Sequence, residues 1–365
     1  MTQKRTHKSA LEEVDGIDQP ESIHTKSVQK IKIKRNTLPS TQVFVKKILE
    51  GDITHLSRAI TLVESSNQKH QQKASEILQA CLSHANNSIR IGITGVPGVG
   101  KSTFIEAFGT YLTGKGKKVA VLAIDPSSSI NKGSILGDKT RMEKLVNDKN
   151  AFIRPSPSGD SLGGVAKKTR ESIILCEAAG FDTIIIETVG VGQSETAVHS
   201  MVDFFLLLKL AGAGDELQGI KRGIIEMADA IVINKADGSN IDKAKLAKTE
   251  FTRALHLYPL KKSNWQPTVT TCSAINNTGI DAIWNIIENY ATLTKSNNYF
   301  DEKRNEQNKF WVLETINTQL KNEFYNNPAI KSELASILSN VQQHKITPFD
   351  AANYLLELYH KKSGY

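Results

Sequence analysis

Cysteine is scarce in this chain, and its few cysteines form no recognisable pattern. The 365 residues include only three, Cys81, Cys176 and Cys272, which are far apart and odd in number. This set argues against a disulfide scaffold, and no C-x-x-C spacing indicates a structural zinc site. Such usage is typical of a reducing compartment, so we expect a cytoplasmic protein.

Long apolar runs and targeting signals are missing as well. A membrane-spanning helix needs about 20 apolar residues, whereas the longest candidate, Phe204 to Leu208, has only the length of a strand. Residues 1–37 contain no apolar stretch typical of a secretory signal, and their acidic residues, from Glu12 to Glu21, argue against a mitochondrial leader. We therefore expect no membrane partner, and we interpret residues 1–37 as a disordered polar tail.

Basic residues are in modest excess over acidic ones, 46 against 38, which gives a net charge of +8. They are spread along the chain, and no RNA-recognition or zinc-finger signature accompanies them. We therefore expect a solvated basic surface with one anionic ligand site, and no nucleic-acid partner. Hydrophobic residues make up 39% of the chain, enough for a sizeable globular core.

The chain between residues 38 and 88 has a helical pattern. Apolar residues from Val45 to Val63 recur at spacings of three and four, which places them on one helix face. Gly51 and Asp52 interrupt this pattern and predict two helices, with Asp52 capping the second. A further helix is expected over Lys73–His84, so we interpret residues 38–88 as a helical N-terminal module.

The spacing then changes to short apolar runs that alternate with helical stretches. This alternation predicts an α/β fold with a mostly parallel sheet and helices on both faces. The expected strands are 89–94, 119–124, 183–187, 203–210, 230–234 and 268–272, and the expected helices are 102–113, 165–179, 219–227, 243–257 and 280–290. We interpret residues 89–292 as one such domain.

Residues 293–365 return to a helical pattern of three helices. Leu313, Ile316, Leu320 and Phe324 share one predicted helix face. A module of this size buries too little surface to fold alone. We expect it to pack on the core, to form a homodimer, or both, and the apolar residues that favour a homodimer include Trp311, Phe324, Tyr354 and Tyr359.

A phosphate-binding loop of the form G-x-x-x-x-G-K-[ST] follows the first predicted strand and opens a helix. Its glycines allow backbone N–H groups to face phosphates, and the helix N-terminus adds a favourable dipole. Lys101 is expected to neutralise the β- and γ-phosphates during catalysis, and Ser102 to offer its hydroxyl to Mg²⁺. The predicted nucleotide-binding residues here are Gly95, Val96, Pro97, Gly98, Val99, Gly100, Lys101, Ser102 and Thr103.

A second motif, N-K-x-D, ends the predicted strand at residues 230–234 and indicates guanine recognition. The carboxylate of Asp237 can accept hydrogen bonds from guanine N1–H and its 2-amino group, a donor pair that adenine lacks, so adenine should be rejected. Lys235 can lay its aliphatic stem over the base. With Asn234, and with Ser273 and Ala274 further along, these residues complete the predicted base-binding set.

Three acidic residues are candidates for a magnesium shell together with Ser102. Glu187 ends a predicted strand at the position where GTPases usually carry the aspartate of D-x-x-G, and Asp125 ends another. Asp138 lies beside a loop glycine. Carboxylate and hydroxyl oxygens suit Mg²⁺, so we predict that Ser102, Asp125, Asp138 and Glu187 hold this ion.

In this order the motifs resemble those of the MeaB/ArgK GTPases. The most specific part of the resemblance is E-T-V-G-V-G-Q-S-E over residues 187–195. Residues 95–103, 125–128, 134–138, 162–164, 213–221 and 234–237 also carry it. Ile130, Asn131 and Lys132 depart from the family, which more often has small residues there.

The resemblance implies a P-loop NTPase that binds GTP or GDP with Mg²⁺ and hydrolyses GTP. It also implies a chaperone of an adenosylcobalamin-dependent acyl-CoA mutase of the methylmalonyl-CoA mutase type, which gates cofactor loading and protects the mutase. A homodimer formed by the C-terminal helices is implied too. In the loop over residues 215–221, Gln218 and Lys221 are expected to assist hydrolysis when the mutase binds.

Two alternative functions use the same nucleotide site. A GTPase that delivers nickel to a metalloenzyme usually carries clustered Cys or His residues, which this sequence lacks. A transport-linked kinase or ATPase would bind adenine, against which N-K-A-D argues.

Val191 occupies the position at which Ras-like GTPases carry their water-orienting glutamine, so intrinsic hydrolysis is expected to be slow.

Overall fold

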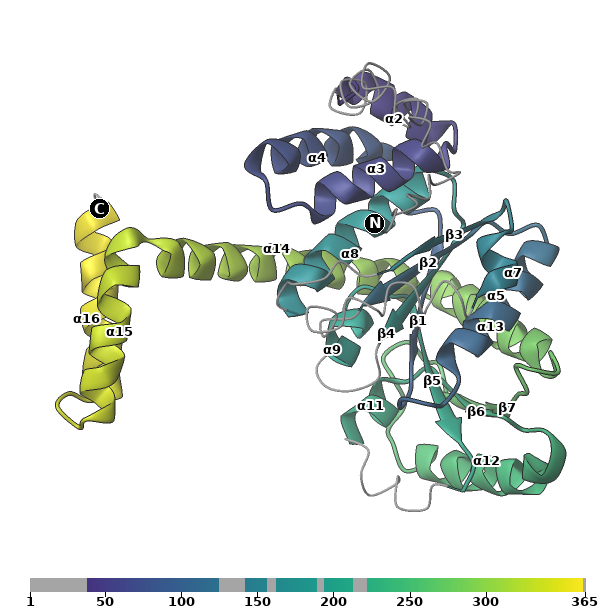
Figure 1. The fold of residues 1–365 in the computed structure, drawn as a ribbon. Coiled ribbons are helices and arrows are strands. Elements are labelled where there is room, and N and C mark those ends of the chain that lie inside the picture. Colours follow the sequence, from purple (N-terminus) through teal and green to yellow (C-terminus); the bar gives the residue numbers. More distant parts are fainter. Residues whose placement is uncertain (1–37, 125–141, 156–161, 189–193, 213–221, 364–365) are drawn as a thin grey trace, which may run out of the picture.

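The fold is built on one seven-stranded sheet in which every pair of neighbouring strands is parallel. The structure, a computed structural model, describes residues 38–124, 142–155, 162–188, 194–212 and 222–363. The strands are β1 (Ile89–Thr94), β2 (Val119–Ile124), β3 (Ala151–Arg154), β4 (Thr183–Thr188), β5 (Phe204–Leu210), β6 (Ala230–Asn234) and β7 (Thr268–Thr271), and their order is β3-β2-β4-β1-β5-β6-β7. The predicted α/β fold with a parallel sheet is therefore confirmed (Figure 1).

Strand β3 is a strand that the sequence pattern did not predict. It has four residues, lies at the edge of the sheet and pairs with β2 alone. Among its residues only Phe152 is buried. An alternation this short does not stand out from a loop, which explains the omission.

Helices cover both faces of the sheet because side chains alternate between the faces along each strand. On one face, α8 (Leu162–Ala178) and α9 (Ser194–His199) pack over Leu122 and Ile186, and α11 (Arg222–Met227) and α12 (Ile241–Leu255) continue this layer over Ile231. On the other face, α5 (Lys101–Gly114) and α13 (Ile280–Ser296) pack over Ile91 and Ile185, with the short α7 (Glu143–Val146) beside α5.

Three N-terminal helices, α2 (Thr41–Leu49), α3 (Ile53–Glu64) and α4 (Gln68–Cys81), extend the first layer. The predicted break between the first two is confirmed. Gly51 has φ 79°, and the Asp52 carboxylate accepts a hydrogen bond from the His55 backbone N–H at 2.7 Å, which caps α3. Leu56 and Ile77 then share one apolar cluster with α8, so these helices pack directly on the core.

The C-terminal residues form the three predicted helices, α14 (Tyr299–Asn326), α15 (Pro328–Gln342) and α16 (Pro348–Ser363). The first half of α14 packs on the core, where the Trp311 indole N–H donates to the Ser200 carbonyl at 3.1 Å. The second half carries α15 and α16 away from the sheet (Figure 1). Although α14 has 28 residues, neither it nor any other described helix is apolar enough to cross a membrane.

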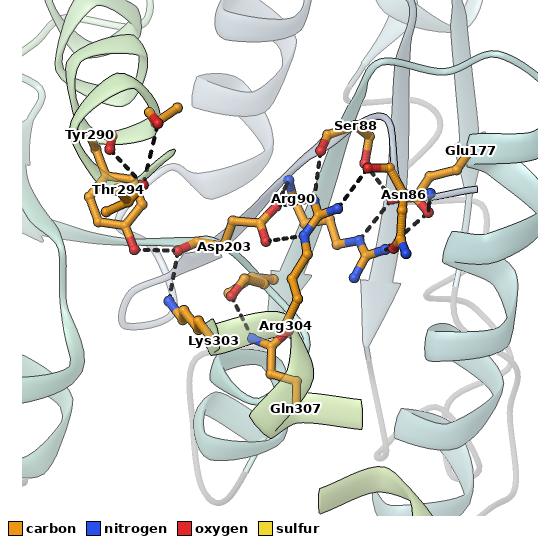
Figure 2. Close-up of polar contacts among 12 residues, drawn as sticks. Asn86, Ser88, Arg90, Glu177, Asp203, Tyr290, Thr294, Lys303, Arg304 and Gln307 are labelled. Carbon is orange, nitrogen blue, oxygen red and sulfur yellow. Dashed lines mark hydrogen bonds and ion pairs between the residues drawn. The ribbon is translucent and has the colours of Figure 1, made fainter. Parts of the chain in front are cut away.

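A buried charged network holds α14 at the amino edge of the sheet (Figure 2). The Arg304 guanidinium donates to both carboxylate oxygens of Asp203, at 2.8 and 2.6 Å, and Lys303 donates to the Asp203 carbonyl at 2.7 Å. The same carboxylate accepts from the Arg90 backbone N–H at 2.8 Å, while the Arg90 side chain is paired with Glu177. Helix α14 is thereby tied to β1, the strand that leads into the phosphate loop.

Candidate nucleotide-binding site

The sequence motifs meet at the carboxyl edge of the sheet. Because all strands run in the same direction, the loops after β1, β4, β6 and β7 leave from this edge. Ligands of open α/β sheets bind at such an edge. The phosphate loop follows β1, and Glu187 lies near the end of β4. The N-K-x-D motif begins at the last residue of β6 and continues into the loop after it.

Backbone geometry of the phosphate loop explains two of its glycines. Gly100 precedes α5 with φ 93°, a left-handed conformation that glycine adopts without strain. A Cβ atom at Gly95 would lie 2.6 Å from the Leu208 carbonyl oxygen on β5. The loop therefore lies closely over the neighbouring strand and delivers the chain to the N-terminus of α5, where backbone N–H groups are available to an anion.

Lys101 lies inside this loop and is mostly buried. Its ammonium donates to the Gly95 carbonyl at 2.8 Å and to the Val96 carbonyl at 3.4 Å. Burial lowers the pKa of Lys101, and the nearby carboxylates of Glu187 and Glu195 oppose that shift. The side chain is thus buried next to acidic groups, inside the loop to which the sequence assigned phosphate binding.

The first two residues of the N-K-x-D motif contact the phosphate loop directly. The Asn234 amide donates to the Val99 carbonyl at 2.9 Å, and the Lys235 ammonium donates to the Gly98 carbonyl at 2.9 Å. A Cβ at Gly100 would lie 3.0 Å from the same Asn234 amide nitrogen. The N-K-x-D motif therefore supports the conformation of the phosphate loop, a role that sequence reasoning did not assign to it.

The last two residues of that motif, Ala236 and Asp237, pair with the loop after β7. The Ser273 hydroxyl donates to a carboxylate oxygen of Asp237, and the Ala236 N–H donates to the Cys272 carbonyl at 2.9 Å. The structure thus brings Asp237 together with Ser273, and Ala274 is buried beside them. These are the residues that the sequence selected for guanine.

The predicted metal shell is described only in part. Glu187 is buried on β4, paired in register with Ile93 of β1, and Ser102 is the second residue of α5. Asp125 and Asp138 lie outside the described residues, as do Gln218 and Lys221. Within the described ranges, no group of three or more His, Cys, Asp or Glu residues could hold a metal ion. The hydroxyl and carboxylate that are described suit Mg²⁺.

Two buried threonines join the strands that lead into the phosphate loop and the acidic loop. The Thr188 hydroxyl donates to the Thr94 hydroxyl at 2.8 Å, between the last residues of β4 and β1. Sequence reasoning missed this contact, although Thr94 ends one predicted strand and Thr188 directly follows another. It fixes the spacing between the two loops that would hold phosphate and metal.

Comparisons with known proteins agree with this geometry. The family model described as methylmalonyl Co-A mutase-associated GTPase MeaB matches residues 56–329. A probable GTPase of Mycobacterium tuberculosis is 46% identical over 84% of this chain and 92% of its own length. GTPase ArgK of Escherichia coli is 44% identical over 86% of this chain and 95% of its own length.

A solved structure extends the match to the fold. The crystal structure of a protein named LAO/AO transport system kinase is 37% identical, with a TM-score of 0.72, and the match covers 89% of this chain and all of that one. The sequence motifs, the parallel sheet and these matches agree, and the chain belongs to the MeaB family of P-loop GTPases.

Proposed function

We propose that this GTPase requires Mg²⁺ and acts as a chaperone of an adenosylcobalamin-dependent acyl-CoA mutase. The family description, which names methylmalonyl Co-A mutase, carries the proposal. A mouse relative named methylmalonic aciduria type A homolog supports it, at 42% identity over 86% of this chain and 78% of its own length. We also propose a cytoplasmic location, in keeping with three buried and unbridged cysteines.

Nucleotide binding would use the phosphate loop for the phosphates and Asp237 for the base. Ser102, Glu187, Asp125 and Asp138 would hold Mg²⁺, which would supply positive charge beside the transferring phosphate when bound. Lys101 would stabilise negative charge that develops on the phosphate oxygens. Asn234 and Lys235 would keep the loop in shape, because both donate to its carbonyls.

Guanine selectivity is expected to depend on the Asp237 carboxylate. A hydrogen bond to a charged group contributes about 1.5–3 kcal/mol. The amide of the Asp237→Asn variant keeps one acceptor oxygen but turns an N–H donor toward a guanine donor, so the variant loses at least one such bond and should bind GTP about 10–100-fold more weakly. Xanthosine triphosphate should be tolerated, because the amide can donate to its additional carbonyl. Competition binding with GTP, XTP and ATP measures this. Asp242→Asn, an exposed position on α12, is the matched control, and wild-type protein that bound ATP as tightly as GTP would refute the selectivity.

The mutase partnership is tested by GTP turnover with and without purified methylmalonyl-CoA mutase. We expect slow hydrolysis by the protein alone and acceleration when the mutase is added. Gln218→Ala and Lys221→Ala should each remove most of this acceleration, because an amide and a cation of this loop would position water and stabilise phosphate charge. Acceleration that survives both substitutions would reject the loop as the coupling element, and a mutase without effect would reject the partnership.

The C-terminal helices support the proposal of a homodimer. Beyond Trp311, α14 leaves Leu313, Ile316 and Leu320 between 49% and 62% exposed along one helix face. Exposed apolar faces of this kind mark interaction surfaces. Because Trp311 instead packs on the core of its own chain, the dimer surface is proposed to begin after it.

Ile316→Asp is expected to convert a dimer into a monomer, because it would bury an unpaired charge in the interface. Light scattering after size-exclusion chromatography measures the mass, and Asn322→Asp, exposed on the same helix, is the control. Truncation near Ala291 is a poorer test, since it would also remove Arg304 from buried Asp203. An unchanged dimer in Ile316→Asp would place the interface elsewhere.

A further inference from the structure

A second buried carboxylate, that of Glu195, lies close to the phosphate-loop lysine. Glu195 is the second residue of α9 and is only 2% exposed. Its Oε2 atom is buried and has no hydrogen-bond partner among the described residues. The neighbouring Ser194 hydroxyl is buried and lacks a partner in the same way. Buried polar atoms in native proteins are nearly always paired, so two such oxygens at the start of one helix indicate a polar ligand or water.

The packing of α9 explains why Glu195 lies at this edge of the sheet. Helix α9 packs on β1 and β4, and a Cβ atom at Gly92 of β1 would lie 2.8 Å from a methyl group of Val198. Glycine at this position therefore allows the helix to approach the sheet closely. The other end of α9 is held by α14, because Trp311 donates to the carbonyl of Ser200, directly after the helix.

The charge balance of the site indicates that Glu195 would favour a bound cation. Among the described groups that act electrostatically on Lys101 are two carboxylates, Glu187 and Glu195. A bound nucleoside triphosphate would add further negative charge against these buried groups. Buried anions are tolerated only when cations compensate them. Lys101 alone cannot balance two carboxylates and the phosphates, so a divalent cation would stabilise the loaded site.

We propose that Glu195 is a positioning residue of the magnesium site, which accepts hydrogen bonds from metal-bound water and raises the affinity of the nucleotide-loaded protein for Mg²⁺. The proposal rests on the Mg²⁺ dependence proposed above, with Ser102 and Glu187 as direct ligands. Glu195 does not contact the metal itself. It hydrogen-bonds to a water that does, as groups around other metal sites orient and stabilise the direct ligands.

The test compares Glu195→Gln, which removes the charge and keeps the shape, with Glu106→Gln as a matched control. Glu106 lies on α5, but its carboxylate accepts from the Lys144 backbone N–H at 2.8 Å, on the other face of the sheet. Mg²⁺ is titrated into full-length protein loaded with a fluorescent, non-hydrolysable GTP analogue, and the rate of nucleotide release is followed. We expect Glu195→Gln to require about 10–100-fold more Mg²⁺ to retain the nucleotide, and Glu106→Gln to match wild type.

Binding of the same analogue in excess EDTA separates a metal role from a structural one. Glu195→Gln should bind the analogue there as tightly as wild type, or more tightly, because a repulsive charge has been removed. Glu195→Asp, which keeps the charge, should restore most of the Mg²⁺ affinity. If Glu195→Gln has wild-type Mg²⁺ affinity, the proposal is wrong, even if the loss of the Glu195 charge raises nucleotide affinity. If wild-type protein retains the analogue equally well without Mg²⁺, the proposed Mg²⁺ dependence itself fails.

Discussion

Replacing Lys101 with alanine is expected to lower the rate of GTP hydrolysis by at least about 10²–10³-fold, the usual effect of removing one preorganised group that stabilises transition-state charge. The ammonium is buried in the phosphate loop and already hydrogen-bonded to the Gly95 carbonyl. It can therefore reach phosphate oxygens by a small rearrangement within the same loop. Its charge matters more in the transition state than in the bound state, so turnover should fall more than affinity for GDP.

Single-turnover hydrolysis and fluorescent GDP binding, measured on the same preparations, separate these two effects. Lys115→Ala, an exposed lysine that directly follows α5, is the matched control and should leave both quantities unchanged. Lys101→Ala protein that hydrolyses GTP within tenfold of the wild-type rate would show that the cation acting on the phosphates comes from elsewhere.

Local sequence patterns predicted most of the sheet, because most of its strands lie in the buried interior. Strands such as Thr183–Thr188 are buried along their whole length and give continuous apolar runs, which are recognisable without knowledge of the fold. Edge strand β3 has only one buried residue and gives no such signal. The capped start of α3 at Asp52 was predictable because it depends on the neighbouring residues alone.

Contacts between distant residues could not be predicted in the same way. The N-K-x-D motif was recognisable by its residues, but the hydrogen bond from Asn234 to the Val99 carbonyl depends on how β6 and the loop after β1 are arranged in space. Likewise nothing near Glu195 in the sequence shows that Gly92 lets α9 approach β1. Such pairings follow from strand order, which the alternation of strands and helices leaves open.

The buried network at the amino edge is the largest feature that sequence reasoning missed. Its carboxylate, Asp203, lies directly before β5, and its principal cation, Arg304, lies on α14, 101 residues later (Figure 2). Both residues are buried, Asp203 at 1% and Arg304 at 6% exposure. Burial alone would raise the pKa of Asp203, but its hydrogen bonds and charge pairing with Arg304 and Arg90 outweigh burial and hold the pKa below its usual value.

Arg304→Ala is therefore expected to lower the free energy of unfolding by about 3–5 kcal/mol, the usual cost of leaving one member of a buried ion pair without its partner. The variant also loses hydrogen bonds from Arg304 to the carbonyls of Asn86 and Ser88, just before β1. Urea denaturation at pH 7 measures the change. Lys309→Ala, exposed on the same helix, should stay within about 0.5 kcal/mol of wild type.

The pH dependence of this loss distinguishes an electrostatic cause from lost packing. In wild type the folded-state pKa of Asp203 is depressed, so its contribution to stability is present above its unfolded-state pKa and is lost as the pH falls. In Arg304→Ala, the pKa of Asp203 should be higher than in wild type, because the hydrogen bonds and charge of Arg304 are the largest contributions that lower it. The cost of removing Arg304 should therefore decline as the pH falls and Asp203 becomes protonated. The stability gap between the two proteins should therefore narrow on acidification from pH 7. A stability difference that stays constant over this range would assign the loss to the packing of the Arg304 side chain and to its hydrogen bonds with the carbonyls of Asn86 and Ser88, because these do not depend on the protonation of Asp203.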